Sequence, residues 1–310
     1  MKGGGVSASA CLPERTESAS ACLPERTESA SACLQELREN PSACLRAQES
    51  IASACRRVLL TADPREKLMV ARQITRGWRL GRYEHCFDVA MPDQPAWPDR
   101  PELLPPSQMP RRGKGGSDRS RITILHALAH IEFIAIDLAF DMVGRFGAGM
   151  PRDFVDDWLS VGADEAMHFA LLDRRLAQLG SHYGALPAHG GLWQSADETA
   201  HDVLARLAIV PMVLEARALD ITPVTIEKFT QAGDAISAKM LGRIVRDEIR
   251  HVHFGTKWFE YGTKSRGFVP AEHYQALVNR HFRGRLKPPF NDSARHEAGL
   301  TRDYYMPLAY

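Results

Sequence analysis

The sequence predicts an all-α protein built around four long helices. Between residues 118 and 262, four segments carry apolar residues at the three- and four-residue spacing of one helix face. Proline and glycine stand at the ends of several of these segments, where helices begin and stop. No segment shows the two-residue alternation of a half-buried strand. Helices of this kind bury their apolar faces against one another, so we expect a bundle with additional segments at either end.

Residues 1–56 consist of an eleven-residue repeat with cysteine at positions 11, 22, 33, 44 and 55. Eleven residues make about three helical turns, so a continuous helix would align the cysteines in a stripe. Pro13, Pro24 and Pro41 interrupt such a helix. Metal motifs usually place cysteines closer together and often pair them with histidine, which this tract lacks. We interpret it as a tandem expansion of one short segment and expect it to be poorly ordered.

Residues 57–117 predict one helix followed by an extended connection. Asp63 is suited to cap a helix N-terminus, and Pro64 fits the first helical position. Residues 86–117 are rich in proline and end in a run of glycine, so they lack a helical period. We expect this connection to wrap over the surface of the bundle.

The long helices follow in order along residues 118–264. They are expected over residues 118–146, 151–179, 196–219 and about 234–262. The second has a proline start and a glycine stop, at Pro151 and Gly180. Thr222 and Pro223 should cap a shorter helix between the third and the fourth. Residues 265–310 predict a short helix after Pro270 and an irregular tail that wraps the bundle.

Each long helix carries one glutamate inside its apolar stripe, and two of the helices add a histidine three residues later. The motifs are "DEAMH" at residues 164–168 and "DEIRH" at residues 247–251. The interval from Glu132 to Glu165 is 33 residues (165 − 132), and that from Glu215 to Glu248 is also 33 (248 − 215). Two antiparallel helix pairs with this interval would place the four carboxylates at one height.

Four buried carboxylates need countercharge, because an unpaired buried charge is very costly. Two metal ions would supply it. Ligation by many oxygen atoms with one imidazole for each metal suits iron or manganese better than a structural zinc ion. The residues therefore predict two ions of iron or manganese; the family resemblance described next implies two iron ions as the cofactor, with an iron and manganese pair as the alternative.

The pattern resembles that of ferritin-like di-iron carboxylate proteins, in which two helices each give one glutamate and two others each give Glu-x-x-His. The resemblance covers about residues 118–262 and implies a ferritin-like four-helix bundle. Glu165 and Glu248 would be candidates to bridge the two ions. The metal ligands that it implies are Glu132, Glu165, His168, Glu215, Glu248 and His251.

A closer match is to a bacterial ferritin-like family known as domain of unknown function 455. The segments that carry this match are "HALAHIEFIAIDLAFD", "DEAMHFALLDRRLAQLG", "AIVPMVLEARALD", "PFNDSARHEAG" and "RPELLPPSQMPRRG". They extend the likeness over most of residues 57–300 and leave the cysteine repeats outside it. The family has no settled substrate.

"DEIRH" is also similar to the motif of bacterial di-iron monooxygenases. That resemblance implies that Asp164 and Asp247 hydrogen-bond the ligating histidines His251 and His168 and fix their tautomer. The same resemblance implies that Arg250, the arginine of "DEIRH", is a nearby charge partner. "DEAMH" departs from the motif, because methionine stands where the arginine would be.

The leading hypothesis is an oxidoreductase that uses O2 and an electron donor to hydroxylate or otherwise oxidise an unknown small or tRNA-linked substrate. The wrapping segments, residues 86–117 and 265–310, suit enclosure of a substrate. One alternative is an iron-handling ferroxidase or storage protein, which would form a hollow assembly of many subunits. The other is a catalytically inactive, metal-stabilised bundle that binds a partner.

Composition constrains the partners and the compartment. The formal net charge is +1, so no global field favours nucleic acid or a membrane. The chain has no apolar run of 18 residues and no signal-peptide core at its start, so we expect a cytoplasmic protein. The basic residues 109–121 could hold a phosphate or an RNA backbone, but a solvated charge run is the better interpretation. A homodimer is compatible with the sequence.

Overall fold

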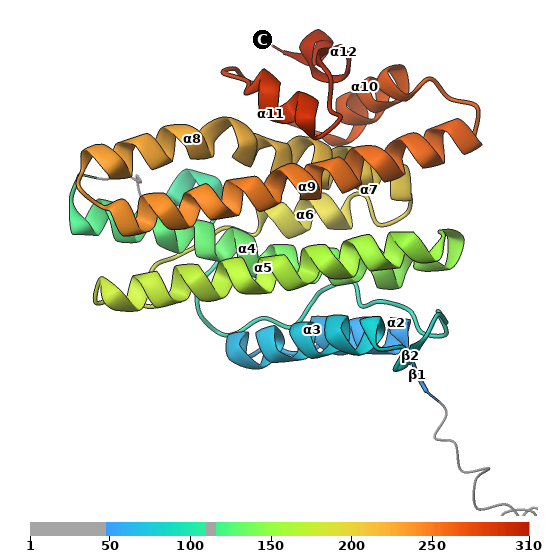
Figure 1. Cartoon of the computed structure of the whole chain (residues 1–310), viewed down its shortest axis with the longest axis horizontal. Coiled ribbons are helices and arrows are strands. Elements are labelled where there is room, and N and C mark those ends of the chain that lie inside the picture. Colours follow the sequence, from blue (N-terminus) through green and yellow to red (C-terminus); the bar gives the residue numbers. More distant parts are fainter. Residues whose placement is uncertain (1–47, 110–115, 310) are drawn as a thin grey trace, which may run out of the picture. The chain divides into compact units, whose positions relative to one another are not determined.

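The computed structural model describes residues 48–109 and 116–309, and these residues are mostly helical (Figure 1). Helices α4 (Asp118–Phe146) and α5 (Arg152–Gln178) pack along each other, and so do α8 (Ala216–Gln231) and α9 (Ala235–Ser265). Contacts between α5 and α9 join the two pairs. A short 3-10 turn, η3 (Gly147–Gly149), follows α4. The prediction of an all-α protein is confirmed.

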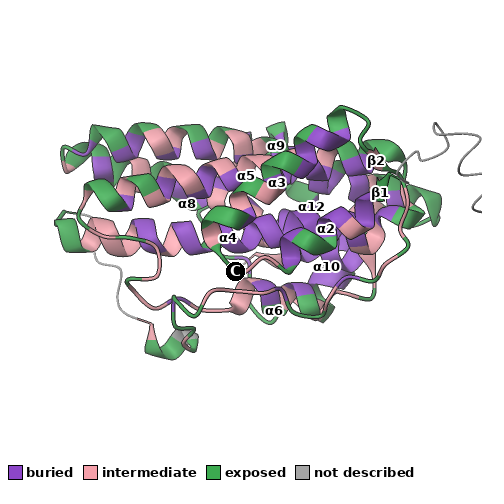
Figure 2. Cartoon of the chain, turned by 90° about the horizontal axis from the view of Figure 1, so that it is seen from below, coloured by how far each residue is buried: buried purple, intermediate pink, exposed green. Residues whose placement is uncertain are grey.

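Helix α4 is buried along most of its length (Figure 2) because its sequence is almost continuously apolar. Its N-terminus is capped by Ser117, whose side chain accepts a hydrogen bond from the backbone N–H of Ser120. In the described part of the chain, Asp118–Gly149 is the one segment long and apolar enough to cross a membrane. However, 67% of its most apolar window is buried within the protein, as in the central helix of a core.

Helices α2 (Ile51–Leu59) and α3 (Pro64–Arg79) cover the outer side of the α4–α5 pair. Asp63 caps α3 by accepting from the backbone N–H of Glu66 at 2.9 Å, as the sequence predicted. Helix α2 was not predicted. It spans the end of the fourth cysteine repeat and the start of the fifth, a stretch without proline, and it buries Cys55 in the core. The expected boundary at residue 56 is therefore too late, whereas the repeats before residue 48 lie outside the described residues.

Two short strands stand beside α2. β1 (Glu49–Ser50) and β2 (Tyr83–Glu84) pair in parallel, with two residues each. A strand of two residues is too short to show alternation in the sequence. From β2 the connection runs without regular structure to the 3-10 turn η2 (Pro106–Gln108). It is fixed by hydrogen bonds such as that from Trp97 Nε1 to Asp137 of α4, at 3.1 Å.

The third long helix differs from its prediction at both ends. The expected start at residue 196 belongs to a separate helix, α6 (Gly191–Asp197), and the next helix, α7 (Val203–Ile209), begins after a turn capped by Asp202. The expected end of the third long helix at residue 219 and the separate helix expected at Thr222 and Pro223 are both wrong, because α8 continues through Pro223 to Gln231. Pro223 cannot donate to the carbonyl of Leu219, and the side-chain amide of Asn291 donates to that carbonyl instead, at 3.2 Å.

Between α7 and α8 the chain forms a π-helical segment, η4 (Val210–Glu215). Pro211 has no backbone N–H, so a regular α-helix would lack one backbone hydrogen bond at this position. The wider π-helical turn changes which backbone groups pair here. The Pro211 ring packs against Gly255 of α9, where an added Cβ would lie 2.6 Å from the Cβ of the proline. Glycine at position 255 therefore permits the close approach of η4 to α9.

The C-terminal residues form short helices rather than the irregular tail expected after the helix at Pro270. These are α10 (Pro270–His281), α11 (Asp292–Glu297), α12 (Arg302–Tyr305) and the 3-10 turn η5 (Met306–Leu308). Arg295 of α11 is buried and donates to both carboxylate oxygens of Asp220 on α8, at 2.9 and 2.7 Å. In Figure 1 these helices cover the α8–α9 pair, on the side opposite α2 and α3.

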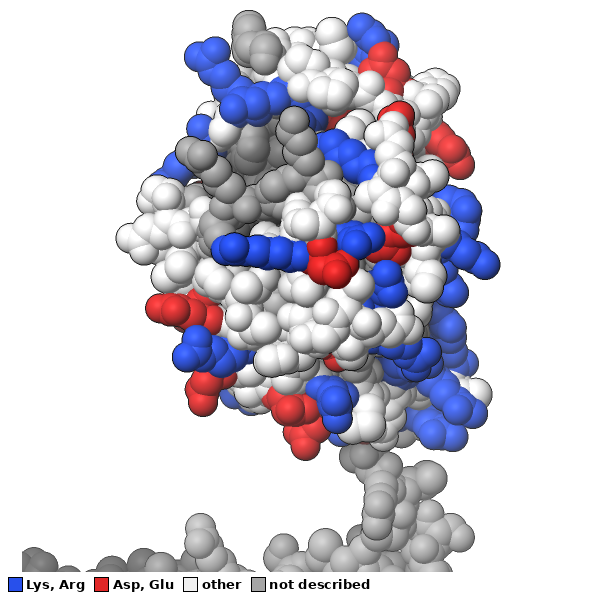
Figure 3. Space-filling model, turned by 90° about the vertical axis from the view of Figure 1, so that its left-hand side faces the viewer, with Lys and Arg blue, Asp and Glu red and all other residues white. Residues whose placement is uncertain are grey.

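The surface carries charges of both signs. On the end of the molecule shown in Figure 3, Lys and Arg side chains stand among Asp and Glu, and uncharged side chains cover most of the face. This distribution agrees with a formal net charge of +1 over the whole chain. That face therefore presents no continuous field of one sign.

Candidate metal centre

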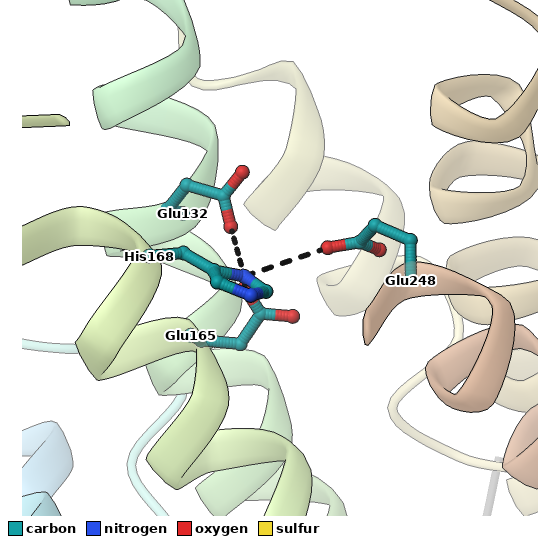
Figure 4. A group of neighbouring side chains, drawn as sticks. All are labelled: Glu132, Glu165, His168 and Glu248. Carbon is teal, nitrogen blue, oxygen red and sulfur yellow. Dashed lines mark hydrogen bonds and ion pairs between the residues drawn. The ribbon is translucent and has the colours of Figure 1, made fainter. Parts of the chain in front are cut away.

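Side chains from α4, α5 and α9 converge in the interior (Figure 4). The residues are Glu132, Glu165, His168 and Glu248, and all of them are buried. One potential ligand atom from each lies within 4.8 Å of the others. His168 Nδ1 is 3.2 Å from Glu132 Oε2, 3.4 Å from Glu165 Oε2 and 3.7 Å from Glu248 Oε1. This group could hold a metal ion.

The remaining two predicted ligands lie beside this group. His251 of α9 is buried, and its Nδ1 is 2.9 Å from Glu165 Oε1 and 3.6 Å from Glu248 Oε1. The rings of His168 and His251 have their centroids 5.8 Å apart. Glu215, at the end of η4, lines the same cavity as Glu132, Glu165 and Glu248. The structure thus brings all six predicted ligand side chains into one region.

Helix geometry explains why the residues meet. In each Glu-x-x-His motif the two side chains are three residues apart and therefore share one face. α5 and α9 face each other across the interior, so Glu165 and His168 lie opposite Glu248 and His251. The α4–α5 and α8–α9 pairs then bring the glutamates of α4 and η4 into the lining of one cavity.

The aspartates of the two motifs form a crosswise pair of hydrogen bonds. His168 Nε2 donates to Asp247 of α9 at 3.1 Å, and His251 Nε2 donates to Asp164 of α5 at 3.4 Å. Each helix thus orients the histidine of the other helix. A proton held on Nε2 leaves the Nδ1 lone pair facing the carboxylates, which is the tautomer a metal ligand needs. Arg250 also forms an ion pair with Asp164.

Burial and like charge oppose ionisation of two of the glutamates. The pKa of Glu132 is raised well above its usual value by burial and then by the charge of Glu165. The pKa of Glu215 is raised in the same way by burial, and then by the charges of Glu248 and Glu165. These carboxylates would ionise more readily beside a bound cation, which offsets both causes.

The two histidines show the opposite tendency. Burial disfavours the charged ring of His168, but hydrogen bonds to Asp247 and Glu132 outweigh it and raise its pKa well above the usual value. Burial also disfavours the charged ring of His251, but the charges of Glu248 and Glu165 raise its pKa. Protons on these rings therefore balance part of the carboxylate charge without metal, and a metal ion would have to displace them.

Several polar atoms in the centre have no hydrogen-bond partner. Among the described residues these include Glu165 Oε2, Glu215 Oε2 and His251 Nδ1, which are buried. His251 Nδ1 is close to Glu165, but the geometry is not that of a hydrogen bond. Buried polar atoms are nearly always paired, and leaving one unpaired costs about 1–3 kcal/mol. Carboxylate oxygen and imidazole nitrogen both coordinate divalent metals, so the residues present fit a metal ion.

Other buried carboxylates of α4 are paired differently. Asp137 forms an ion pair with the buried Lys67, and Asp141 forms one with the buried Arg206. Within the described residues, no Lys or Arg forms an ion pair with any of the four glutamates of the centre. Among the described residues, Lys67 and Arg206 thus pair with these other buried carboxylates, whereas only the two histidines lie within ion-pair distance of the glutamates of the centre.

A cavity of about 160 Å³ adjoins the centre and is bordered by all four glutamates. Most of its other lining side chains are apolar. They include Leu128, Ile131, Leu214, Ile221, Leu241 and Ile244. An organic group in this cavity would lie next to the carboxylates.

The chain was also compared with known proteins. The profile of the family described as "Protein of unknown function (DUF455)" matches residues 60–306. The chain belongs to this family. It is similar to a protein of Haemophilus influenzae described as "Uncharacterized protein", with 38% identity over 255 residues, or 79% of this chain and 88% of that one. No solved structure matches the chain.

The match to the DUF455 family includes every residue of the candidate centre and the helices that carry them. Sequence reasoning alone did not find the cavity of this DUF455 chain. Its lining includes Leu192 of α6 and Ile131 and Ile221 of the long helices. The one sequence signal for a cavity was Pro211, four residues before Glu215. A proline there indicated that the helix is irregular next to this glutamate.

Proposed function

We propose that this chain is a ferritin-like four-helix protein whose centre binds two iron ions, or one iron and one manganese ion, and oxidises an organic substrate with O2. The main support is the arrangement of the donors around two shared carboxylates. Glu132, His168, Glu165 and Glu248 form one group that could hold an ion. His251 approaches the carboxylates of the same Glu165 and Glu248, and Glu215 lines the cavity that these glutamates border, so we propose that they complete a second site. Glu165 and Glu248 are therefore the residues that we propose as bridges.

The donor chemistry supports iron or manganese. The six side chains offer carboxylate oxygen and imidazole nitrogen and no thiolate, a set that suits these metals better than a structural zinc ion. Two bound iron ions would supply redox chemistry for the reduction of O2, with further electrons from an external donor. The protein's own contribution would be to hold the imidazoles through Asp164 and Asp247 and to exclude bulk water by burial of the ligands.

The cavity favours an organic substrate over iron storage. Its walls apart from the glutamates are mainly apolar, whereas a route for hydrated iron would be lined by polar and acidic side chains. The short helices that cover both sides of the long ones are more suited to a small assembly than to a hollow cage. We therefore place oxidation of a substrate before ferroxidase activity or metal-stabilised binding of a partner.

Metal content and oxygen consumption test the proposal. Protein loaded with Fe(II) without oxygen should bind two iron ions for each chain and should consume O2 when it is added. Glu248→Ala removes a proposed bridge and should lower bound iron, while Glu227→Ala, at an exposed position of α8, should not. Retention of two irons by the first variant would contradict the assignment. A mass in solution of many subunits would favour iron storage.

A further inference from the structure

The cavity beside the centre, called here the inner pocket, has a size that limits its occupant. Its volume is about 160 Å³. A cavity of about 150 Å³ lined by aliphatic and aromatic side chains takes up benzene. The inner pocket therefore has room for an apolar group of about six carbon atoms. A charged or strongly polar group would lose its hydration against the apolar walls and could recover hydrogen bonds only at the glutamates.

The inner pocket opens past apolar side chains. Ile131 of α4 and Ile221 of α8 line it and are 39% and 40% exposed, respectively. Arg217 is the one Lys or Arg among its described lining residues. Its Nη1 donates to the backbone carbonyls of Lys287 and Pro289, so this side chain is engaged in fixing the C-terminal segment. The entrance therefore admits an apolar group and gives no clear anchor for a charged one.

A larger cavity, called here the outer pocket, continues from the inner one. Its volume is about 520 Å³, and it shares Ile131, Leu192 and Leu214 with the inner pocket. Away from this junction its lining includes hydrogen-bonding side chains, such as Gln194 and Ser195 of α6, together with the apolar ring of Phe282. Volumes of about 300–1,000 Å³ are typical of sites for whole small molecules.

The outer pocket has little net charge. Arg283, at its edge, forms an ion pair with Glu198, which also lines the pocket. His281 lines it as well, and burial lowers its pKa, which favours the neutral ring. The outer pocket thus suits a polar, hydrogen-bonding group rather than a strongly charged one.

From these two pockets we infer that the substrate of the proposed centre is a small amphiphilic molecule that enters with its apolar end first. An apolar group of about the size of a phenyl ring occupies the inner pocket beside the glutamates. The polar, uncharged remainder lies in the outer pocket. That the bound molecule is a substrate rests on the proposed function. The binding itself, which the inference predicts, does not require metal.

Binding to metal-free, full-length protein tests the inference. Benzene serves as the probe of the inner pocket, and 3-phenylpropan-1-ol serves as the probe of both pockets. Titration followed by NMR or calorimetry should show one saturable site for each probe, with tighter binding of the alcohol. Absence of saturable benzene binding would overturn the inference.

Variants locate the two ends of the probe. Ala218→Leu adds bulk to the wall of the inner pocket and should weaken both probes about ten-fold or more. Ala135→Leu, on the facing wall, is a second filling variant should the first fold poorly. Ala177→Leu adds the same bulk at an exposed position of α5 and should change neither affinity. Unchanged benzene affinity in both folded filling variants would overturn the placement.

The outer pocket is tested in the same way. Gln194→Trp introduces a large ring at an exposed position of α6 that lines only the outer pocket. It should weaken the alcohol and leave benzene unchanged, whereas equal weakening of both probes would overturn the proposed orientation. Protein that binds benzene but no iron would contradict the proposed function alone. Protein that binds two irons but no benzene would contradict this inference alone.

Discussion

Replacement of Glu215 by glutamine should affect stability with opposite signs in the presence and absence of metal. Glu215 Oε2 is buried without a hydrogen-bond partner, and burial together with the charges of Glu248 and Glu165 raises the pKa of this carboxyl. A raised pKa in the folded state means that stability is lost as pH rises through that value. Glu215→Gln removes the ionisable group and keeps the shape, so metal-free variant protein should be more stable than wild type at pH 8.

The magnitude follows from the cost of the unpaired carboxylate. An unsatisfied buried group costs about 1–3 kcal/mol, and the amide recovers only part of this because its own donor also needs a partner. We expect a gain of about 1–2 kcal/mol at pH 8, or roughly 2–8 °C in melting temperature for a chain of this size. The gain should shrink towards pH 5, where the wild-type carboxyl is protonated more fully.

Iron should reverse the order. At a free iron concentration about 1,000-fold above the dissociation constant, binding stabilises the wild type by about 4 kcal/mol. If loss of one ligand weakens binding about 100-fold, the variant gains only about 1.4 kcal/mol at the same concentration. Thermal unfolding followed by circular dichroism, with and without Fe(II) under nitrogen, measures both differences.

The control for this experiment is Glu227→Gln, the same change at an exposed position of α8. It should alter neither melting temperature. A metal-free Glu215→Gln variant that is less stable than wild type at pH 8 would refute the electrostatic reasoning. An undiminished iron-dependent rise would show that Glu215 is not a ligand.

Three further predictions concern the surroundings of the centre. Asp247→Asn weakens the hydrogen bond that orients His168 and should lower iron affinity about 10–100-fold in an anaerobic titration; unchanged affinity would show that this bond does not orient the ring. Gly255→Ala places a methyl group 2.6 Å from the Cβ of Pro211 and should cost about 1–3 kcal/mol in urea unfolding, whereas full stability would mean that η4 shifts freely. Burial lowers the pKa of His126 to about 4, and its Nε2 accepts two backbone N–H groups of the loop after α5. Because the folded pKa is the lower one, its contribution to stability is complete above about pH 6.5 and is lost as pH falls towards 4. His126→Gln should reduce the slope of stability against pH in this window, and an unaltered slope would contradict this origin.

The long helices could be predicted because their apolar faces extend over many turns. The expected range 118–146 agrees with α4, where Ser117 and Asp118 begin the helix. The expected break between residue 219 and a new helix at Thr222 and Pro223 was wrong for a reason that local sequence does not contain. The carbonyl freed by this proline is satisfied by Asn291, which is 72 residues away from Leu219. A helix end thus depended on a contact between distant segments.

The candidate ligands could be identified because a glutamate inside an apolar stripe is costly and needs a reason. The structure adds facts that spacing does not give. The cavity depends on Leu192, which lies in α6 although the sequence predicted no helix between residues 180 and 195, and on the π-helical turn of η4. The unpaired state of Glu165 Oε2 depends on side-chain orientation. Spacing therefore predicts which residues share a face, and only the packed structure predicts the space between them.

The two hydrogen bonds that cross between α5 and α9, each from a histidine of one helix to an aspartate of the other, have a mechanical consequence. Since Asp164 holds His251 and Asp247 holds His168, a slip of one helix by a single turn would break both attachments together. The two helices are thereby locked in one register, and partial sliding yields no intermediate in which one histidine stays anchored. Opening of the interior should accordingly occur in a single concerted event, so that both imidazoles are released or retained as a unit.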